Sequence, residues 1–165
     1  MRFRSFSTTL TVTTTLLLTA GPAVAAAAKP APTTTAQPRS RTVTYEGVSL
    51  RVPASWPVLN LTRHPSACPR LDVHAVYIGR PGPAPLCPAD LAGKATAVQL
   101  QAASPDSPDL RQATRATVIG GKPARTNADA AQTHTIIDVL PSAGIEVSLS
   151  YGGSPAQARS IEKSI

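Results

Sequence analysis

The chain has 165 residues, a formal net charge of +7, two cysteines and one tryptophan. Its basic residues are scattered singly, without the run or stripe that marks a nucleic-acid-binding protein, so the charge argues against a nucleic-acid partner. The length allows one domain of ordinary size with its own core.

The N-terminus predicts a secretory signal peptide over residues 1–25. Arg2 and Arg4 supply the charged start, residues 10–20 form an apolar run, and residues 23–25 (AVA) match a small-x-small cleavage site. The apolar run is too short and too rich in threonine for a membrane span. We therefore expect a secreted protein, extracellular or cell-wall associated, with no transmembrane segment after signal cleavage.

Residues 26–41 consist largely of Ala, Pro and Thr and predict a flexible linker, because such a segment buries too little apolar surface to offset its ordering entropy. The folded domain is then expected over residues 42–165. Loss of Arg2 and Arg4 leaves 14 basic against 9 acidic side chains. This excess predicts good solubility and a weak attraction to anionic wall polymers.

The domain opens with a strand at residues 48–52, where Val and Leu alternate with Ser and Arg. Pro53 has no amide hydrogen and is expected to end this strand. Trp56 follows a tight turn, and in a chain with so few aromatic residues we expect it in the core.

The two cysteines, Cys68 and Cys87, bracket a second predicted strand at residues 73–78, which is apolar on nearly both faces. In an exported protein two thiols are expected to form a disulfide rather than a metal or redox site. By the loop-entropy model this bond stabilises the fold by roughly 3 kcal/mol.

Further strands are predicted from alternation, and Gly120-Gly121 is expected to form a tight hairpin turn. Their ranges are 96–101, 114–119, 122–126, 133–140 and 145–151. The C-terminus predicts a helix, with Ser154 as N-cap, Pro155 at the first helical position and Gln157 completing a capping box. The apolar face of this helix would consist of Ala158, Ile161 and Ile165.

These elements predict an α+β domain: an antiparallel sheet of five to seven strands, with the C-terminal helix packed on it and one disulfide. Its VPASWPV (52–58), Cys68, AVYIG (75–79) and CPA (87–89) segments resemble a secreted actinobacterial domain of unknown function, a similarity that covers about residues 45–100. That domain sometimes precedes a glycoside-hydrolase-like domain in longer proteins. The opening strand, proline and tryptophan are also similar to PsbP-like domains. Neither resemblance implies a role for a particular residue.

The sequence selects no catalytic, metal-binding or cofactor-binding residue. His64, His74 and His134 lack the spacing of a zinc site. The only visible acid–base pairs are Asp72 with His74 and His134 with Asp138, which we interpret as exposed pairs on one face of a strand. No nucleophile elbow or phosphate-binding loop occurs. We therefore expect no enzyme activity and no cofactor.

A proline-rich loop at residues 79–86, tethered at its end by Cys87, is a possible contact loop with Arg80, Pro83 and Leu86 as its contact residues. Our first hypothesis is a secreted non-catalytic module that binds a protein or a cell-wall polymer. The alternatives are a small secreted hydrolase with an unrecognised site and a protease-inhibitor-like protein that uses this loop. Inhibitors of the subtilisin type carry two disulfides, whereas this chain can form one. Catalytic groups lining a pocket would favour the hydrolase, and a protruding loop the inhibitor.

Overall fold

The structure is a computed structural model that describes residues 39–83, 86–88, 91–127 and 130–165. The signal peptide and all but the last residues of the linker lie outside the described residues. The elements are β1 (Ser40–Tyr45), β2 (Val48–Pro53), β3 (Val58–Asn60), β4 (Val76–Ile78), β5 (Ala97–Ala102), α1 (Pro108–Gln112), β6 (Arg115–Ile119), β7 (Lys122–Thr126), α2 (Ala130–Thr133), β8 (Thr135–Leu140), β9 (Ile145–Ser150) and α3 (Ala156–Glu162).

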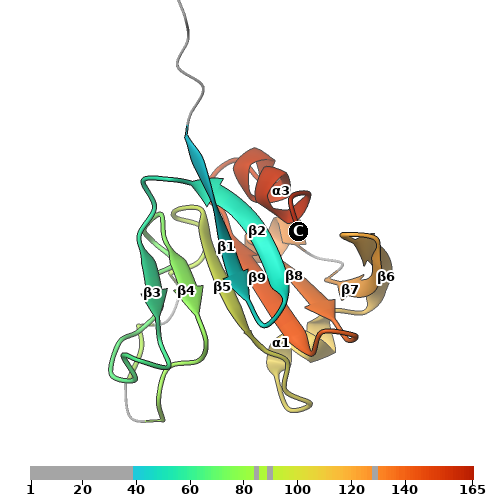
Figure 1. Cartoon of the computed structure of the whole chain (residues 1–165), viewed down its shortest axis with the longest axis horizontal. Coiled ribbons are helices and arrows are strands. Elements are labelled where there is room, and N and C mark those ends of the chain that lie inside the picture. Colours follow the sequence, from blue (N-terminus) through green and yellow to red (C-terminus); the bar gives the residue numbers. More distant parts are fainter. Residues whose placement is uncertain (1–38, 84–85, 89–90, 128–129) are drawn as a thin grey trace, which may run out of the picture. The chain divides into compact units, whose positions relative to one another are not determined.

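The strands form two sheets (Figure 1). The first is the antiparallel hairpin β1–β2, which turns at Glu46 and Gly47, both with positive φ. The second has seven strands in the order β3-β4-β5-β9-β8-β7-β6. Strands β3, β4 and β5 are parallel to one another, and the remaining pairs are antiparallel. The predicted α+β class is confirmed, although the large sheet is mixed rather than wholly antiparallel.

The disulfide between Cys68 and Cys87 is confirmed, with the two Cα atoms 5.3 Å apart. It joins the loop before β4 to the loop after it, so the covalent ring encloses this strand. Strand β4 itself is shorter than expected: it starts at Val76, because residues 73–75 belong to the preceding loop.

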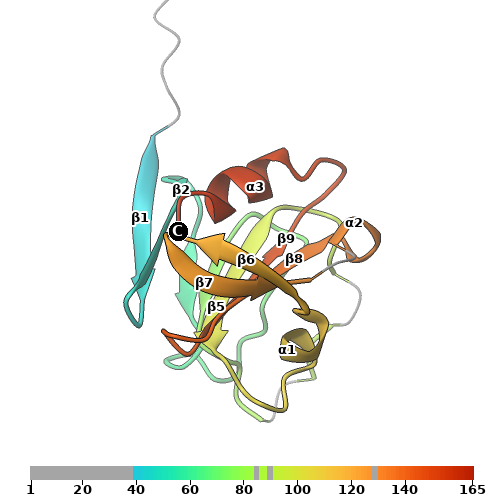
Figure 2. The same cartoon turned by 90° about the vertical axis from the view of Figure 1, so that its right-hand side faces the viewer.

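The main core lies on one face of the large sheet, under the hairpin β1–β2 and helix α3. Leu50 and Val52 of the hairpin pack there with Trp56, which is only 6% exposed, as expected of a core residue. Helix α3 contributes Ala158 and Ile161. Figure 2 shows α3 and α1 on opposite sides of β8 and β9. On the α1 side, Ala113, Ile137 and Val139 form a smaller cluster.

The C-terminal helix is confirmed, but its start differs from the prediction. Pro155 is the N-cap and not the first helical residue, and the predicted capping box is not formed. Instead the amide of Ala156 donates to Ser154 Oγ over 3.3 Å. Among the described residues no helix has the length and apolar character needed to cross a membrane.

Candidate functional site

Helix α3 borders a groove that it shares with the hairpin β1–β2. The groove has a volume of about 290 Å³ and is lined by Arg39, Ser40, Arg51, Val52, Pro53, Gln157, Ser160, Ile161 and Ser164. The amide of Arg51 donates to Ser164 Oγ over 2.8 Å, so the free edge of β2 is tied to the end of the helix. Ser164 Oγ in turn donates to the carbonyl of Ile161 over 2.6 Å. These two bonds connect β2 and α3, the two walls of the groove.

Two further hollows lie nearby. One, of about 380 Å³, is formed by β6 with Arg159, Glu162 and Lys163. The other, of about 60 Å³, contains Lys122 and the C-terminal Ile165. We call the groove, these two hollows and the helix between them the α3 surface. Its charged side chains are Arg39, Arg51, Lys122, Arg159, Glu162 and Lys163.

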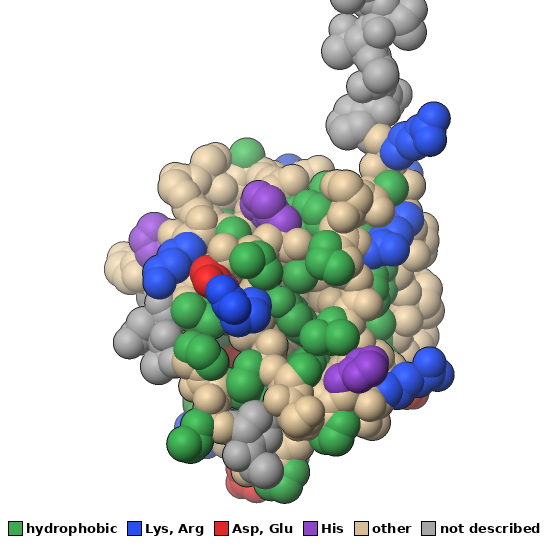
Figure 3. Space-filling view, turned by 90° about the vertical axis from the view of Figure 1, so that its left-hand side faces the viewer, with side chains coloured by type: hydrophobic (Ala, Val, Ile, Leu, Met, Phe, Trp, Pro, Cys, Tyr) green, Lys and Arg blue, Asp and Glu red, His purple; other side chains and the backbone are tan. Residues whose placement is uncertain are grey.

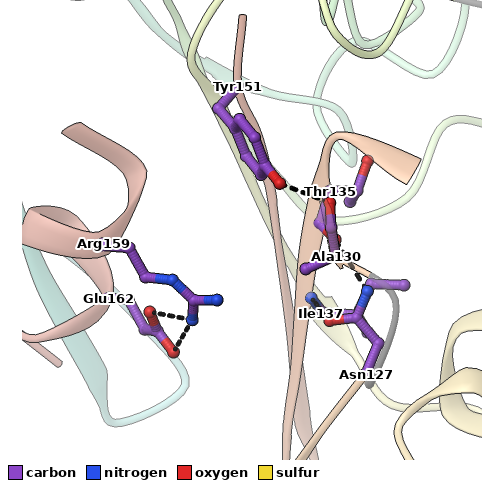
Figure 4. A network of polar contacts seen from close by, with 7 residues as sticks. All are labelled: Asn127, Ala130, Thr135, Ile137, Tyr151, Arg159 and Glu162. Carbon is purple, nitrogen blue, oxygen red and sulfur yellow. Dashed lines mark hydrogen bonds and ion pairs between the residues drawn. The ribbon is translucent and has the colours of Figure 1, made fainter. Parts of the chain in front are cut away.

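The α3 surface carries positive charge with little compensation. The one acidic side chain among its described lining residues, Glu162, is paired with Arg159 at 2.9 Å (Figure 4). Neither Arg39 nor Arg51 forms an ion pair within the part of the chain that the structure describes. An anion that reaches this surface would meet free guanidinium and ammonium groups, together with the hydroxyl groups of the groove.

Beneath α3 lies a buried carboxyl group, Asp138 of β8. It is fully buried, and neither of its carboxyl oxygens has a hydrogen-bond partner in the described structure. Burial raises the pKa of Asp138 to about 7; the hydroxyl of Thr126 on the neighbouring strand β7 opposes this rise, and the nearby Glu162 carboxylate adds to it. The sequence predicted that His134 and Asp138 form an exposed pair on one face of a strand. In the structure Asp138 is buried, whereas His134 is exposed and precedes β8 with a φ of 53°.

A network of polar contacts holds the start of β8 and the end of β9 in place (Figure 4). The Tyr151 hydroxyl donates to the carbonyl of Ala130 in α2. Asn127, which is buried, donates to the Thr135 carbonyl over 2.8 Å and accepts from the Ile137 amide over 3.0 Å. These bonds satisfy backbone groups and leave no side chain poised for chemistry, so we assign the network to the fold.

On the opposite face of the sheet, Glu146 of β9 is also fully buried. Its Oε1 accepts from Gln101 Nε2 over 2.5 Å, and Gln101 Oε1 accepts from Gln99 over 3.0 Å. Burial raises the pKa of Glu146, and the neighbouring Asp109 carboxyl raises it further. Asp109 also accepts from Ser148 Oγ over 3.2 Å. This carboxyl pair was missed by the sequence analysis, and neither member lines any of the three hollows of the α3 surface.

Among the described residues, none of the three histidines forms an acid–base pair with a carboxylate. His74 stacks on Trp56 with the ring centroids 5.2 Å apart, and its Nδ1 lies 2.9 Å from the Thr96 carbonyl oxygen. Asp72, the expected partner of His74, is instead bound by both nitrogen donors of Arg70, which lowers the pKa of Asp72. Within the described residues, no group of three or more His, Cys, Asp or Glu side chains could hold a metal ion.

The possible contact loop lies beside β4, on the side of the molecule shown in Figure 3, where apolar side chains gather. Arg80 and Pro83 are exposed and Leu86 is fully exposed, whereas residues 84–85 lie outside the described residues. Arg80 donates to the Ala102 carbonyl over 3.1 Å, which ties the start of the loop to β5. A contact role for this loop stays a prediction.

The α3 surface was also missed by the sequence analysis. Its basic residues come from three separate parts of the chain: residues 39–51, Lys122 and residues 159–163. Each of them looks isolated in the sequence, and no local signal shows that they meet. No known protein family, curated protein or solved structure matches the chain. The resemblances to a secreted actinobacterial domain and to PsbP-like domains therefore stay predictions.

Proposed function

We propose that the protein is a secreted, non-catalytic module that binds an anionic cell-wall polymer through the α3 surface. The observation that carries this proposal is the charge of that surface: five basic side chains surround the helix, and the single carboxylate among them is already paired. Secretion rests on the predicted signal peptide.

A polymer suits this surface better than a small anion does. The basic groups lie in three hollows rather than in one deep pocket. Each exposed charge contributes little alone, and salt screens it over a Debye length of about 8 Å at physiological ionic strength. A chain with repeated anionic groups engages several hollows at once, and its overall affinity then exceeds that of any single contact.

The hydrolase alternative has less support. The buried carboxyl pair of Glu146 and Asp109 is the closest approach to an acid–base site, but it lines none of the three hollows. A substrate would need a cavity next to these groups. The inhibitor alternative rests on the 79–86 loop alone, and the Arg80 contact to β5 ties this loop down at its start.

The test is co-sedimentation of the exported protein with isolated bacterial cell wall, before and after chemical removal of the anionic polymers. We expect binding to the intact wall, loss of binding to the stripped wall, and steep weakening as salt is raised. A Lys122→Glu, Lys163→Glu variant should bind much less, because both side chains are exposed on the α3 surface.

The matched control is Arg63→Glu, Arg125→Glu, which makes the same change in net charge at two exposed positions that do not line the α3 surface. Circular dichroism would verify that both variants are folded. Equal losses in the two variants would show that only net charge matters, and binding that persists on stripped wall would contradict the proposal outright.

A further inference from the structure

The groove between the hairpin β1–β2 and α3 has the composition of an anion seat. Five of its side chains carry free donors: Arg39, Ser40, Arg51, Gln157 and Ser160. All five are exposed, and none of these side chains forms a hydrogen bond or ion pair within the described part of the chain. No carboxylate lines the groove. Among the described residues, these donors therefore have no competing carboxylate.

Arg39 directly precedes β1 and Arg51 lies in β2, and both residues line the groove. Arg39 is held by the Ala54 amide, which donates to its carbonyl over 2.8 Å, and Arg51 is held by Ser164. Arg41 of β1 is already occupied, since it donates to the carbonyl of Trp56. Two guanidinium groups on anchored backbone segments thus remain for a ligand.

The floor of the groove is apolar. Val52 is 1% exposed and Ile161 is 3% exposed, and Pro53 lies beside them. Such a floor contacts carbon atoms and offers no hydrogen bonds. The ligand that fits is therefore an anionic group carried within a carbon chain, with the anion at the arginines and the carbon atoms against Pro53, the half-buried residue of this floor.

From this arrangement we infer that the groove binds the phosphodiester group of a polyol phosphate chain; the inference rests on the proposed function and names its ligand chemistry. A phosphodiester presents four acceptor oxygens in one group, whereas a carboxylate presents two, and five free donor side chains match the former better. Guanidinium groups also bind the two charged phosphate oxygens in a bidentate manner.

Other phosphodiesters fit less well. None of the groove residues is aromatic, whereas proteins that hold single-stranded nucleic acid stack its bases on aromatic side chains. Of the apolar groove residues, Val52 and Ile161 are buried and Pro53 is half-buried, so they offer no protruding side chain for insertion into a lipid bilayer. A flexible polyol phosphate has neither bases nor acyl chains. It therefore needs only hydrogen-bond donors and a small apolar contact, both of which the groove supplies.

The experiment is isothermal titration of the exported protein with a short synthetic oligomer of glycerol phosphate at about 0.15 M salt. Oligoglutamate, single-stranded DNA and phosphatidylglycerol vesicles serve as the comparison ligands. We expect the glycerol phosphate oligomer to bind best. An Arg39→Gln, Arg51→Gln variant should bind it roughly 30-fold more weakly, because two charge-assisted contacts are lost.

The control variant is Arg63→Gln, Arg125→Gln, which removes the same charge outside the groove and should change the affinity by less than about threefold. Equal effects of the two variants would overturn the groove assignment while leaving wall binding intact. Equal or tighter binding of oligoglutamate, DNA or vesicles would overturn the ligand class. Absence of binding to every ligand, combined with retention on the cell wall, would overturn this inference but not the proposed function.

Discussion

Two carboxyl groups on neighbouring strands, Asp138 of β8 and Glu146 of β9, are buried to the same extent but on opposite faces of the large sheet. Asp138 pairs in register with Val147, and Glu146 with Val139, so the two acidic side chains point away from each other. Both are fully buried. Glu146 accepts a hydrogen bond from Gln101 at one carboxyl oxygen, Oε1, and lacks a partner at Oε2, whereas both oxygens of Asp138 lack a partner within the described structure.

The difference shows that the groups covering each face, in addition to burial itself, decide what a buried acid costs. On the α1 side Gln101 donates a hydrogen bond to Glu146, and Gln99 donates one to Gln101. On the α3 side Asp138 lies on the face of the sheet that carries the apolar residues of the main core. A buried carboxylate without partners is unfavourable, so the neutral form of Asp138 is favoured. The two faces should therefore respond differently to mutation and to pH.

The largest effect is expected from breaking the apolar cover itself. Trp56→Ala should lower the free energy of unfolding by about 3–5 kcal/mol, because it removes the largest side chain of the main core. Chemical denaturation followed by circular dichroism would measure this loss. His74→Ala is the control, since it removes the exposed ring stacked on Trp56 and should cost far less. Similar losses in the two variants would place Trp56 outside the core.

The next largest effect concerns Asp138. Its folded-state pKa of about 7 lies above the value of 3.8 for an unperturbed carboxyl, so the folded state holds its proton more tightly. The stability that this proton provides is complete below about pH 4 and is lost as the pH rises through 7. Asp138→Asn cannot ionise and should be more stable than the wild type at pH 8, by on the order of 2–4 kcal/mol.

The same variant should show little gain at pH 4, where the wild-type carboxyl is already protonated. Denaturation curves at a series of pH values would measure the difference between the two proteins. A gain at pH 8 equal to that at pH 4 would mean that Asp138 does not titrate in the way its surroundings indicate.

A smaller, opposite effect is expected at Glu146. Glu146→Leu should destabilise the fold by about 1–3 kcal/mol at pH 4, because the buried amide of Gln101 then loses its acceptor. The double variant Glu146→Leu, Gln101→Leu should recover part of this loss, since no unpaired amide remains. If Glu146→Leu were neutral and Asp138→Asn destabilising at every pH, the contrast between the faces would be wrong.

The smallest effect tests the cover over Glu146. Ser107 is the N-cap of α1, and its Oγ accepts from the Asp109 amide over 3.2 Å. Ser107→Ala should cost about 1 kcal/mol. Hydrogen exchange should show faster opening of α1 and unchanged protection in α3, because the two helices lie on different faces of the sheet. Uniform loss of protection would indicate that the two covers are coupled.

The sequence predicted those parts of the fold that depend on local patterns. Strands β2 and β5 to β9 follow from alternation. The tight turn follows from the two consecutive glycines, Gly120 and Gly121, and both adopt a positive φ in the structure. The disulfide follows from export and a matched count of cysteines. Helix α1 was missed although Ser107, Pro108 and Asp109 form a good helix start, because only five residues follow the cap.

What escaped prediction depends on contacts between distant segments. Strand β1 starts at Ser40, which the composition had placed in the linker, because pairing with Pro53 outweighs the local preference. The parallel arrangement of β3, β4 and β5 cannot be read from alternation. Alternation places Glu146 and Val147 on opposite faces of β9. Whether the face with Glu146 meets water or α1 depends on the tertiary packing. The same holds for the α3 surface, which gathers basic residues that are scattered in the sequence.

The Cys68–Cys87 bond has a mechanical consequence. When the chain is pulled from its ends, the covalent ring that contains β4 cannot be drawn out. The bond spans 19 residues, which at about 3.3–3.6 Å per residue corresponds to roughly 60 Å of chain withheld from extension. Under tension the oxidised protein therefore extends to a shorter length than the reduced protein. The segment between Cys68 and Cys87, which contains β4, stays a closed loop after the rest of the chain has been extended.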